Sequence, residues 1–117
     1  MKYKYLGNTK VKVSSICLGT MTFGEQTSKA ESFRMMDYAH EQGINFFDTA
    51  EIYPVYPKKE TAGNTEEIIG DWINLRKKRE KIVIATKIAS GHPKGVGATG
   101  LKWIRGGYKK LGFDKKN

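Results

Sequence analysis

The sequence predicts an α/β fold in which parallel strands alternate with helices. Three observations carry this prediction: two nearly continuous apolar runs, a third run rich in β-branched residues, and apolar residues at helical spacing between the runs. With 117 residues and a hydrophobic share of 38%, the chain is long enough to form one packed domain. Right-handed βαβ connections of this kind occur both in doubly wound sheets and in (β/α)8 barrels.

The N-terminal part of the chain predicts a β-hairpin followed by a buried strand. Lys and Tyr alternate over residues 2–5, Lys and Val alternate over residues 10–13, and a Gly-Asn pair lies between the two runs. The apolar run Ser15–Thr20 is typical of a strand that is buried on both faces. We interpret Cys17, inside this run, as a small buried hydrophobic residue, and a single cysteine suits a reducing compartment.

The first helix and the second strand follow directly. Ser28, with Glu31 three residues later, predicts a capping box at the start of a helix over Lys29–Gln42, and Gly43 predicts its end. Ile44–Asp48 then predicts a second buried strand.

A long polar segment and a second helix come next. The polar stretch Glu51–Gly63 contains two prolines and predicts a loop, and loops of this length are usually functional. Asn64 is expected to cap the second helix, and Ile82–Lys87 predicts the third strand. A third helix is expected over residues 101–111, although two adjacent glycines weaken it. The apolar face of the second helix is formed by Ile68, Ile69, Trp72 and Ile73.

The formal charge of +9 is concentrated in the last third of the chain. Residues 1–75 contain 8 Lys and Arg against 10 Asp and Glu, whereas residues 76–117 contain 13 against 2. The basic run of residues 76–79 lies between a predicted helix and a predicted strand and contains no aromatic residue, which favours a solvated turn. A polyanion-binding site remains the alternative interpretation, but no nucleic-acid partner is expected.

Three polar residues at strand ends are the candidates for catalysis. Asp48 ends the second strand, Tyr53 follows in the loop, and Lys87 ends the third strand. Active sites of parallel α/β folds lie at the carboxyl ends of their strands, and neighbouring strands are about 4.8 Å apart. A tyrosine is a weak acid unless a nearby cation stabilises its phenolate. An Asp–Lys–Tyr group of this kind could protonate a carbonyl oxygen, and the alternative is a surface ion pair beside a loop aromatic.

Several segments resemble the aldo-keto reductase family, and they stand in the family's order. Residues 48–53, Asp-Thr-Ala-Glu-Ile-Tyr, resemble its D-T-A-x-x-Y signature. Residues 6–14 resemble its opening hairpin, residues 18–24 its first strand and turn, residues 64–70 the start of the helix behind the tyrosine loop, and residues 85–87 its third strand. The resemblance covers nearly the whole chain.

This resemblance implies a fold, a reaction and a set of site residues. The fold would be the N-terminal portion of a (β/α)8 TIM-type barrel, with a hairpin and about three βα units. The reaction would be NADPH-dependent reduction of an aldehyde or ketone, with Tyr53 as general acid tuned by Lys87 and Asp48. The nicotinamide end of the cofactor would be lined by Gly19, Thr20, Met21 and Asp48. No metal site is expected.

The resemblance also implies that residues 1–117 form a partial domain. The family's fourth catalytic residue, a histidine after the fourth strand, has no match, because His40 lies on the first predicted helix and His92 in a predicted loop. We therefore expect the chain to be truncated before the fourth strand, inactive alone, and prone to self-association through exposed strand edges. The alternative is a noncatalytic binding module that uses the basic last third of the chain.

Two further expectations concern a second motif and the location of the protein. The run Gly95–Gly100 satisfies G-x-G-x-x-G, but it does not follow its strand directly, so a flexible loop is expected rather than a dinucleotide fingerprint. The chain opens with alternating Lys and Tyr where a signal peptide would be apolar, and no apolar run is long enough to span a membrane. A soluble cytoplasmic protein is expected.

Overall fold

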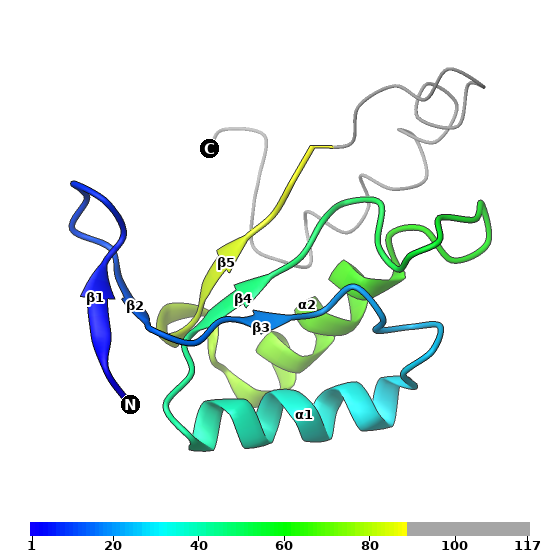
Figure 1. Cartoon of the computed structure of the whole chain (residues 1–117). Helices are drawn as coiled ribbons and strands as arrows, with labels where there is room; N and C mark the ends of the chain where they lie inside the picture. The colour runs from blue at the N-terminus through cyan, green and yellow to red at the C-terminus, as the bar shows by residue number, and fades with distance from the viewer. Residues whose placement is uncertain (89–117) are drawn as a thin grey trace.

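The computed structural model describes residues 1–88, which form a hairpin, a three-stranded parallel sheet and two α-helices (Figure 1). The predicted hairpin and the alternation of parallel strands with helices are confirmed. The third predicted helix, the glycine-rich run and His92 lie outside the described residues. In chain order the elements are β1 (Tyr3–Tyr5), β2 (Lys12–Ser14), β3 (Leu18–Gly19), α1 (Lys29–Glu41), β4 (Phe46–Asp48), α2 (Asn64–Arg76), a short 3-10 helix (Arg79–Lys81) and β5 (Val83–Ala85).

The hairpin lies at the end of the molecule where the parallel strands begin (Figure 1). Its strands β1 and β2 are antiparallel, and Tyr3 lies opposite Ser14. The Tyr3 hydroxyl donates a 2.6 Å hydrogen bond to the carbonyl of Gly43, and the Ser14 N–H donates one of 2.7 Å to Oδ1 of Asn45. These bonds fix the hairpin to the segment between α1 and β4, away from the carboxyl ends of the parallel strands.

The start and end of α1 are set by local hydrogen bonds. Oγ of Ser28 accepts from the Glu31 N–H at 3.1 Å, and the Glu31 carboxylate accepts from the Ser28 N–H at 3.3 Å, which confirms the capping box. At the other end, Gly43 has φ +89° and Ile44 donates its N–H to the carbonyl of Ala39. This left-handed turn directs the chain from the helix into β4.

The predicted cap of α2 is displaced by one residue. Gly63, with φ +89°, is the N-cap, and Asn64 is the first helical residue, so the prediction that Asn64 caps the helix is wrong. The cause is the left-handed backbone of Gly63, which turns the loop into the helix without a capping side chain. The Gly63 N–H instead donates a 2.9 Å hydrogen bond to the carbonyl of Tyr53.

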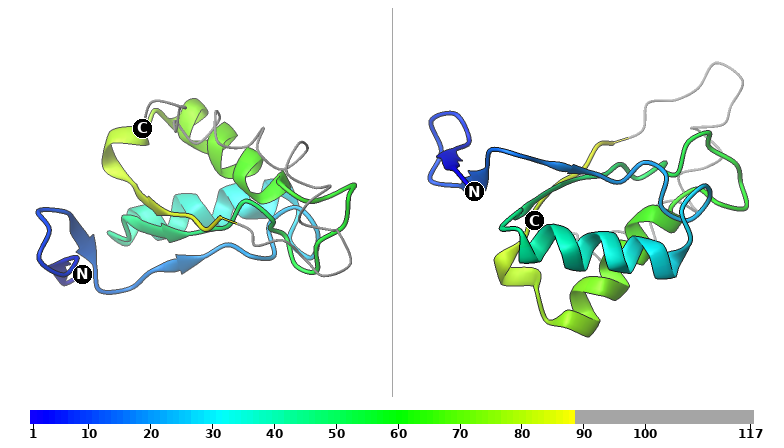
Figure 2. Two further views of the ribbon diagram at one scale, coloured as in Figure 1. Left: turned by 90° about the horizontal axis from the view of Figure 1, so that it is seen from above. Right: turned by 60° about the horizontal axis from the view of Figure 1, so that its bottom comes forward.

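Both helices cover the same face of the parallel sheet, as Figure 1 and the right-hand view of Figure 2 show. The predicted apolar face of α2 is confirmed, since all four of its residues are buried. The core cluster between the helices and the sheet consists of Phe23, Met36, Ala39, Phe47, Ile68, Ile69, Trp72, Ile73 and Ile82.

The other face of the sheet has no helix on it within residues 1–88, and this overturns one expectation. Leu18 packs against the core, but Cys17 is exposed and Ile16 is 55% exposed. Cys17 is therefore not buried, because alternate residues of a strand point to opposite faces and the helices of residues 1–88 cover only one of them.

The basic run of residues 76–79 forms the predicted turn. Arg76 ends α2, and Lys77 adopts a left-handed conformation with φ +54° directly after it. Arg79 begins the 3-10 helix and donates to the carbonyl of Ile82. Among residues 1–88, neither α-helix has the length and apolar character needed to cross a bilayer.

Candidate active site

The candidate site lies at the carboxyl end of the parallel sheet, where β4 and β5 run on beyond their paired residues. Asp48, the last residue of β4, lies opposite Ala85 of β5. The Thr49 N–H donates to the carbonyl of Ala85 at 2.8 Å, and the Glu51 N–H donates to the carbonyl of Lys87 at 3.2 Å. These two bonds hold the extended segments after both strands side by side, and they bring the side chains of Asp48 and Lys87 to the same face.

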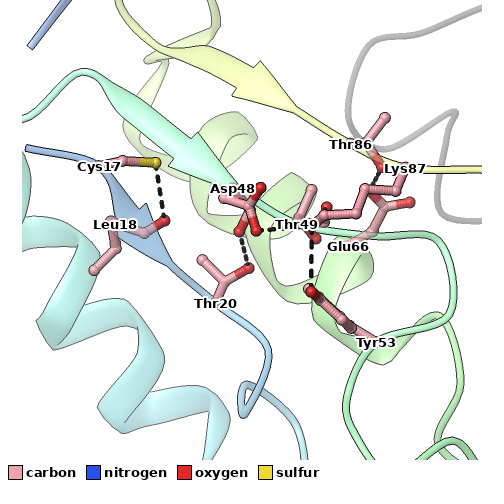
Figure 3. Close-up of polar contacts among 9 residues, drawn as sticks. All are labelled: Cys17, Leu18, Thr20, Asp48, Thr49, Tyr53, Glu66, Thr86 and Lys87. Carbon is pink, nitrogen blue, oxygen red and sulfur yellow. Dashed lines mark hydrogen bonds and ion pairs between the residues drawn. The ribbon is translucent and has the colours of Figure 1, made fainter.

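Lys87 is the centre of the site (Figure 3). Its Nζ lies 2.8 Å from Oδ2 of Asp48, 2.9 Å from the carbonyl oxygen of Thr49 and 3.2 Å from the hydroxyl oxygen of Tyr53. An ammonium group has three hydrogens to donate and cannot accept. Here the three hydrogens are donated to Asp48, to the Thr49 carbonyl and to Tyr53. Asp48, Tyr53 and Lys87, the three residues expected at the strand ends, therefore lie in contact.

The direction of the bond between Lys87 and Tyr53 has a chemical consequence. Because Nζ can only donate, the Tyr53 oxygen accepts from it, and the phenolic hydrogen remains available to another acceptor. Nζ also lies 4.8 Å from the centroid of the Tyr53 ring. The positive charge is therefore held beside the oxygen on which negative charge would develop if the tyrosine gave up its proton.

Neighbouring charges decide the protonation state of Lys87. Partial burial by itself lowers the pKa of Lys87, but its hydrogen bonds to Asp48 and Tyr53 and the negative charge of Asp48 outweigh this effect, so the pKa is raised. The lysine stays charged at neutral pH. The side chains of Lys87 and Asp48 are 49% and 38% exposed, so the group is accessible from the open face of the sheet.

The loop that carries Tyr53 is tied to the loop after β3. The Tyr53 N–H donates to the carbonyl of Ala50 at 3.1 Å, and the Val55 N–H donates to the carbonyl of Met21 at 3.0 Å. Gln26 donates through Nε2 to the carbonyl of Val55 at 3.2 Å. In addition, Lys58 forms an ion pair with Glu25.

The other predicted site residues lie along β3 and just beyond it. Gly19 lies opposite Asp48 in the sheet register. Thr20 is fully buried, and its hydroxyl donates a 2.7 Å hydrogen bond to the main-chain carbonyl of Asp48. Met21 is 51% exposed at the start of the following loop. Gly19 and Met21 are therefore accessible beside Asp48, whereas the Thr20 side chain is committed to holding β4 in place.

Sequence reasoning missed a second group of residues on the covered side of the same strand ends. Glu66 is fully buried, and its Oε2 accepts a 2.7 Å hydrogen bond from the hydroxyl of Thr86 (Figure 3). The available signal was spacing, because Glu66 precedes Ile69 and Ile73 by three and seven residues and so falls on the apolar face of α2. A carboxyl on an apolar helix face indicates a buried polar contact.

Two other titratable residues take no part in this arrangement of side chains. His40 lies on α1, partly buried, with its ring edge-on to Trp72 at 6.3 Å, as expected of a helix-face residue. Cys17 is exposed but partly desolvated by its neighbours, and this desolvation and the nearby Asp48 carboxylate raise the pKa of its thiol, which disfavours its nucleophilic form. Residues 1–88 contain no group of three or more metal-ligating side chains.

Comparison with known proteins places this geometry in a family. The family model described as "Aldo/keto reductase family" matches residues 15–115. Protein tas of Escherichia coli (strain K12) is 47% identical over 89 residues, covering 76% of this chain and 26% of that protein. The uncharacterized oxidoreductase YrpG of Bacillus subtilis (strain 168) is 51% identical over 89 residues, covering 75% of this chain and 26% of that protein. The chain thus spans about a quarter of the length of these relatives.

The solved structures agree with this assignment. An aldo-keto reductase of Bacillus halodurans in its holo form superposes with a TM-score of 0.71 and 27% identity, over 97% of this chain and 37% of that one. The fold is accordingly the N-terminal portion of a (β/α)8 barrel, which confirms the fold expected from the sequence. Because the family model matches most of this chain, the chain belongs to the aldo-keto reductase family.

Proposed function

We propose that this chain supplies the proton-donating part of a carbonyl reductase site, which reduces an aldehyde or ketone to an alcohol. Tyr53 is the general acid, and Lys87 and Asp48 tune it. The observation that carries the proposal is the set of three bonds from Lys87 Nζ, because they leave the phenolic hydrogen of Tyr53 free to be donated.

The residues divide the work of proton transfer. When hydride reaches the carbonyl carbon, negative charge develops on the carbonyl oxygen, and Tyr53 donates its proton there to form the alcohol. The phenolate left on Tyr53 is stabilised by the Lys87 ammonium, which lies 3.2 Å from its oxygen. Asp48 keeps Lys87 charged and in position, and solvent returns a proton to Tyr53 after the product leaves.

NADPH is the cofactor that we propose, and when bound it supplies the hydride. The residues present fit a flat ring at this face. An added Cβ at Gly19 would meet no atom within 4 Å, so the surface beside Asp48 is open. Gly19, Met21 and Asp48 would hold the nicotinamide end, and Thr20 would act indirectly through the main chain of Asp48.

The test uses a chimera that joins this chain to the part of the Bacillus subtilis relative beyond the matched segment. The 117-residue chain alone is expected to reduce 4-nitrobenzaldehyde at a negligible rate, because cofactor binding and positioning supply most of the acceleration. In the active chimera, Tyr53→Phe should lower kcat by about 10²- to 10⁴-fold while NADPH affinity, measured by fluorescence quenching, stays nearly constant. Lys87→Met should act in the same direction.

The matched control is Tyr38→Phe, which removes the same hydroxyl from a tyrosine that is 65% exposed on α1. Its kcat should equal that of the unsubstituted chimera. Full activity in the Tyr53→Phe chimera would mean that the proton comes from another group, and the proposal would then be wrong.

A further inference from the structure

A buried carboxyl lies on the covered side of the strand ends that carry Asp48 and Lys87, and it has no part in the proton transfer described above. Glu66, in the first turn of α2, has no exposed surface. Its Oε2 accepts from Thr86, and its Oε1 is buried without a hydrogen-bond partner among residues 1–88. Burying a carboxyl with one oxygen unsatisfied is costly, whereas an apolar side chain at the same position would avoid that cost.

The alternation of the two strand ends places Glu66 next to the catalytic group. Asp48 and Lys87 point to the open face, so their neighbours Thr49 and Thr86 point to the covered face, where α2 packs. The hydroxyl of Thr86 holds Glu66, and the carbonyl of Thr49 holds Nζ of Lys87. The same two extended segments therefore carry the Lys87 contacts on one side and the Glu66 contacts on the other.

The groups around Glu66 bias it toward the protonated form. Burial raises the pKa of Glu66 to about 7, and the charge of the fully buried Glu51, after β4, adds to this shift. The hydrogen bond from Thr86 opposes the shift, as do the nearby Thr49 hydroxyl and the charge of Lys87. The Thr49 hydroxyl acts by proximity, because its Oγ1 makes no hydrogen bond of acceptable geometry within residues 1–88.

We propose that Glu66 is a positioning residue whose protonation controls how strongly Lys87 acts on Tyr53. With Glu66 neutral, Asp48 is the carboxylate in direct contact with Lys87, and the charge of Lys87 acts on the Tyr53 oxygen. With Glu66 ionised, an additional negative charge lies on the covered side of the strand ends and weakens the stabilisation of the Tyr53 phenolate by Lys87. Proton donation by Tyr53 therefore becomes slower as the pH rises. The catalytic meaning of this coupling rests on the proposed role of Tyr53, but the coupling itself does not.

The test is a pH titration of the full 117-residue chain by NMR, with 13C labels at the side-chain carboxyl of Glu, at Cε of Lys and at Cζ of Tyr. The expected result is that the signals of Lys87 and Tyr53 show an inflection at the same pH as the Glu66 carboxyl, within the range 5 to 9. Glu66→Gln keeps an acceptor for Thr86 but cannot ionise, so it should remove the inflection from both signals.

Glu67→Gln is the matched control, because it removes a neighbouring, partly exposed carboxyl from the same helix turn and should leave the inflection unchanged. The proposal is overturned if the Lys87 signal shows no inflection where Glu66 titrates, if Glu66 titrates below pH 5, or if the inflection persists in Glu66→Gln. The unsubstituted chain alone decides the first two outcomes, so the result does not depend on the variant folding. A catalytic failure of Tyr53 would appear in the chimera assay and not here.

Discussion

Glu66 makes a specific contribution to the pH dependence of stability. Its pKa is about 7 in the folded chain and 4.5 in a solvated carboxyl, so the folded state binds the extra proton between these values. The contribution of Glu66 to the free energy of unfolding should therefore fall as the pH rises from about 4.5 to about 7, and it should be constant above pH 7. A shift of this size corresponds to about 3 kcal/mol.

Urea unfolding of the 117-residue chain at several pH values measures this directly. The difference in unfolding free energy between the unsubstituted chain and Glu66→Gln should change across this window, and it should be constant above it. Comparing the two chains cancels the contributions of titrating groups that do not interact with Glu66. A difference that does not change between pH 4.5 and 7 would show that folding does not raise the pKa of Glu66.

The placement of single residues was predictable where it followed from the end of a strand. Asp48 and Lys87 were expected at the carboxyl edge of the sheet because they directly follow apolar runs, and Tyr53 was expected in the loop after the second strand. The three side chains do meet. Glu66 was missed because its role depends on which helix covers which strand end, and this is a tertiary property. The burial of Cys17 was predicted wrongly for a related reason, since an apolar run does not reveal whether both faces of its strand are covered.

The packing of α1 on α2 is centred on Trp72. This side chain is fully buried, its ring lies 5.6 Å from that of Phe47, and its Nε1 donates a 2.8 Å hydrogen bond to Asp37 of α1. Arg76 forms two further hydrogen bonds with the same carboxylate. One tryptophan therefore joins both helices to the sheet.

Trp72→Ala should accordingly lower the free energy of unfolding by about 3–5 kcal/mol, because it leaves a large cavity and removes one of the three hydrogen bonds to the Asp37 carboxylate. Leu75→Ala is the control, since Leu75 lies on the same helix but is 65% exposed, and its cost should be within about 0.5 kcal/mol. Chemical denaturation measures both variants. Similar costs for the two substitutions would contradict the observed packing.

Whole elements were predicted better than their boundaries. Helix α1 was expected over Lys29–Gln42 and ends at Glu41, one residue earlier. The agreement is close because the capping box and the terminal glycine are local signals in the sequence. The strand expected over Ser15–Thr20 is paired only at Leu18–Gly19. Pairing requires a partner alongside, and an apolar run does not indicate where the neighbouring strand begins to accompany it.

At the scale of the whole molecule, residues 1–88 leave one face and both outer edges of the parallel sheet uncovered. Strand β3 is paired only with β4 within the described residues, and β5 likewise. Large apolar side chains are exposed near these edges, including Ile16, Met21 and Ile88, which is 77% exposed. Unpaired strand edges with apolar side chains favour association between chains.

We therefore expect the 117-residue chain to self-associate as its concentration rises. Sedimentation velocity should show larger species, and Ile16→Lys should reduce them, because a charge beside an edge strand opposes pairing. Leu75→Lys introduces the same charge on the helical side and should have less effect. A compact monomer at high concentration in the unsubstituted chain would refute this expectation.

The bonds between the loops after β3 and β4 also bear on how such a site diversifies during evolution. Met21, Gln26 and Glu25 hold the tyrosine loop at Val55 and Lys58, whereas Tyr56, between those two points, is 85% exposed and carries no such bond among the described residues. Substitutions at the loop tip are therefore expected to leave Tyr53, the proposed proton donor, in place. If Tyr53 has that role, duplicated copies of such a gene could change at the tip and acquire new substrate preferences while keeping the same proton donor.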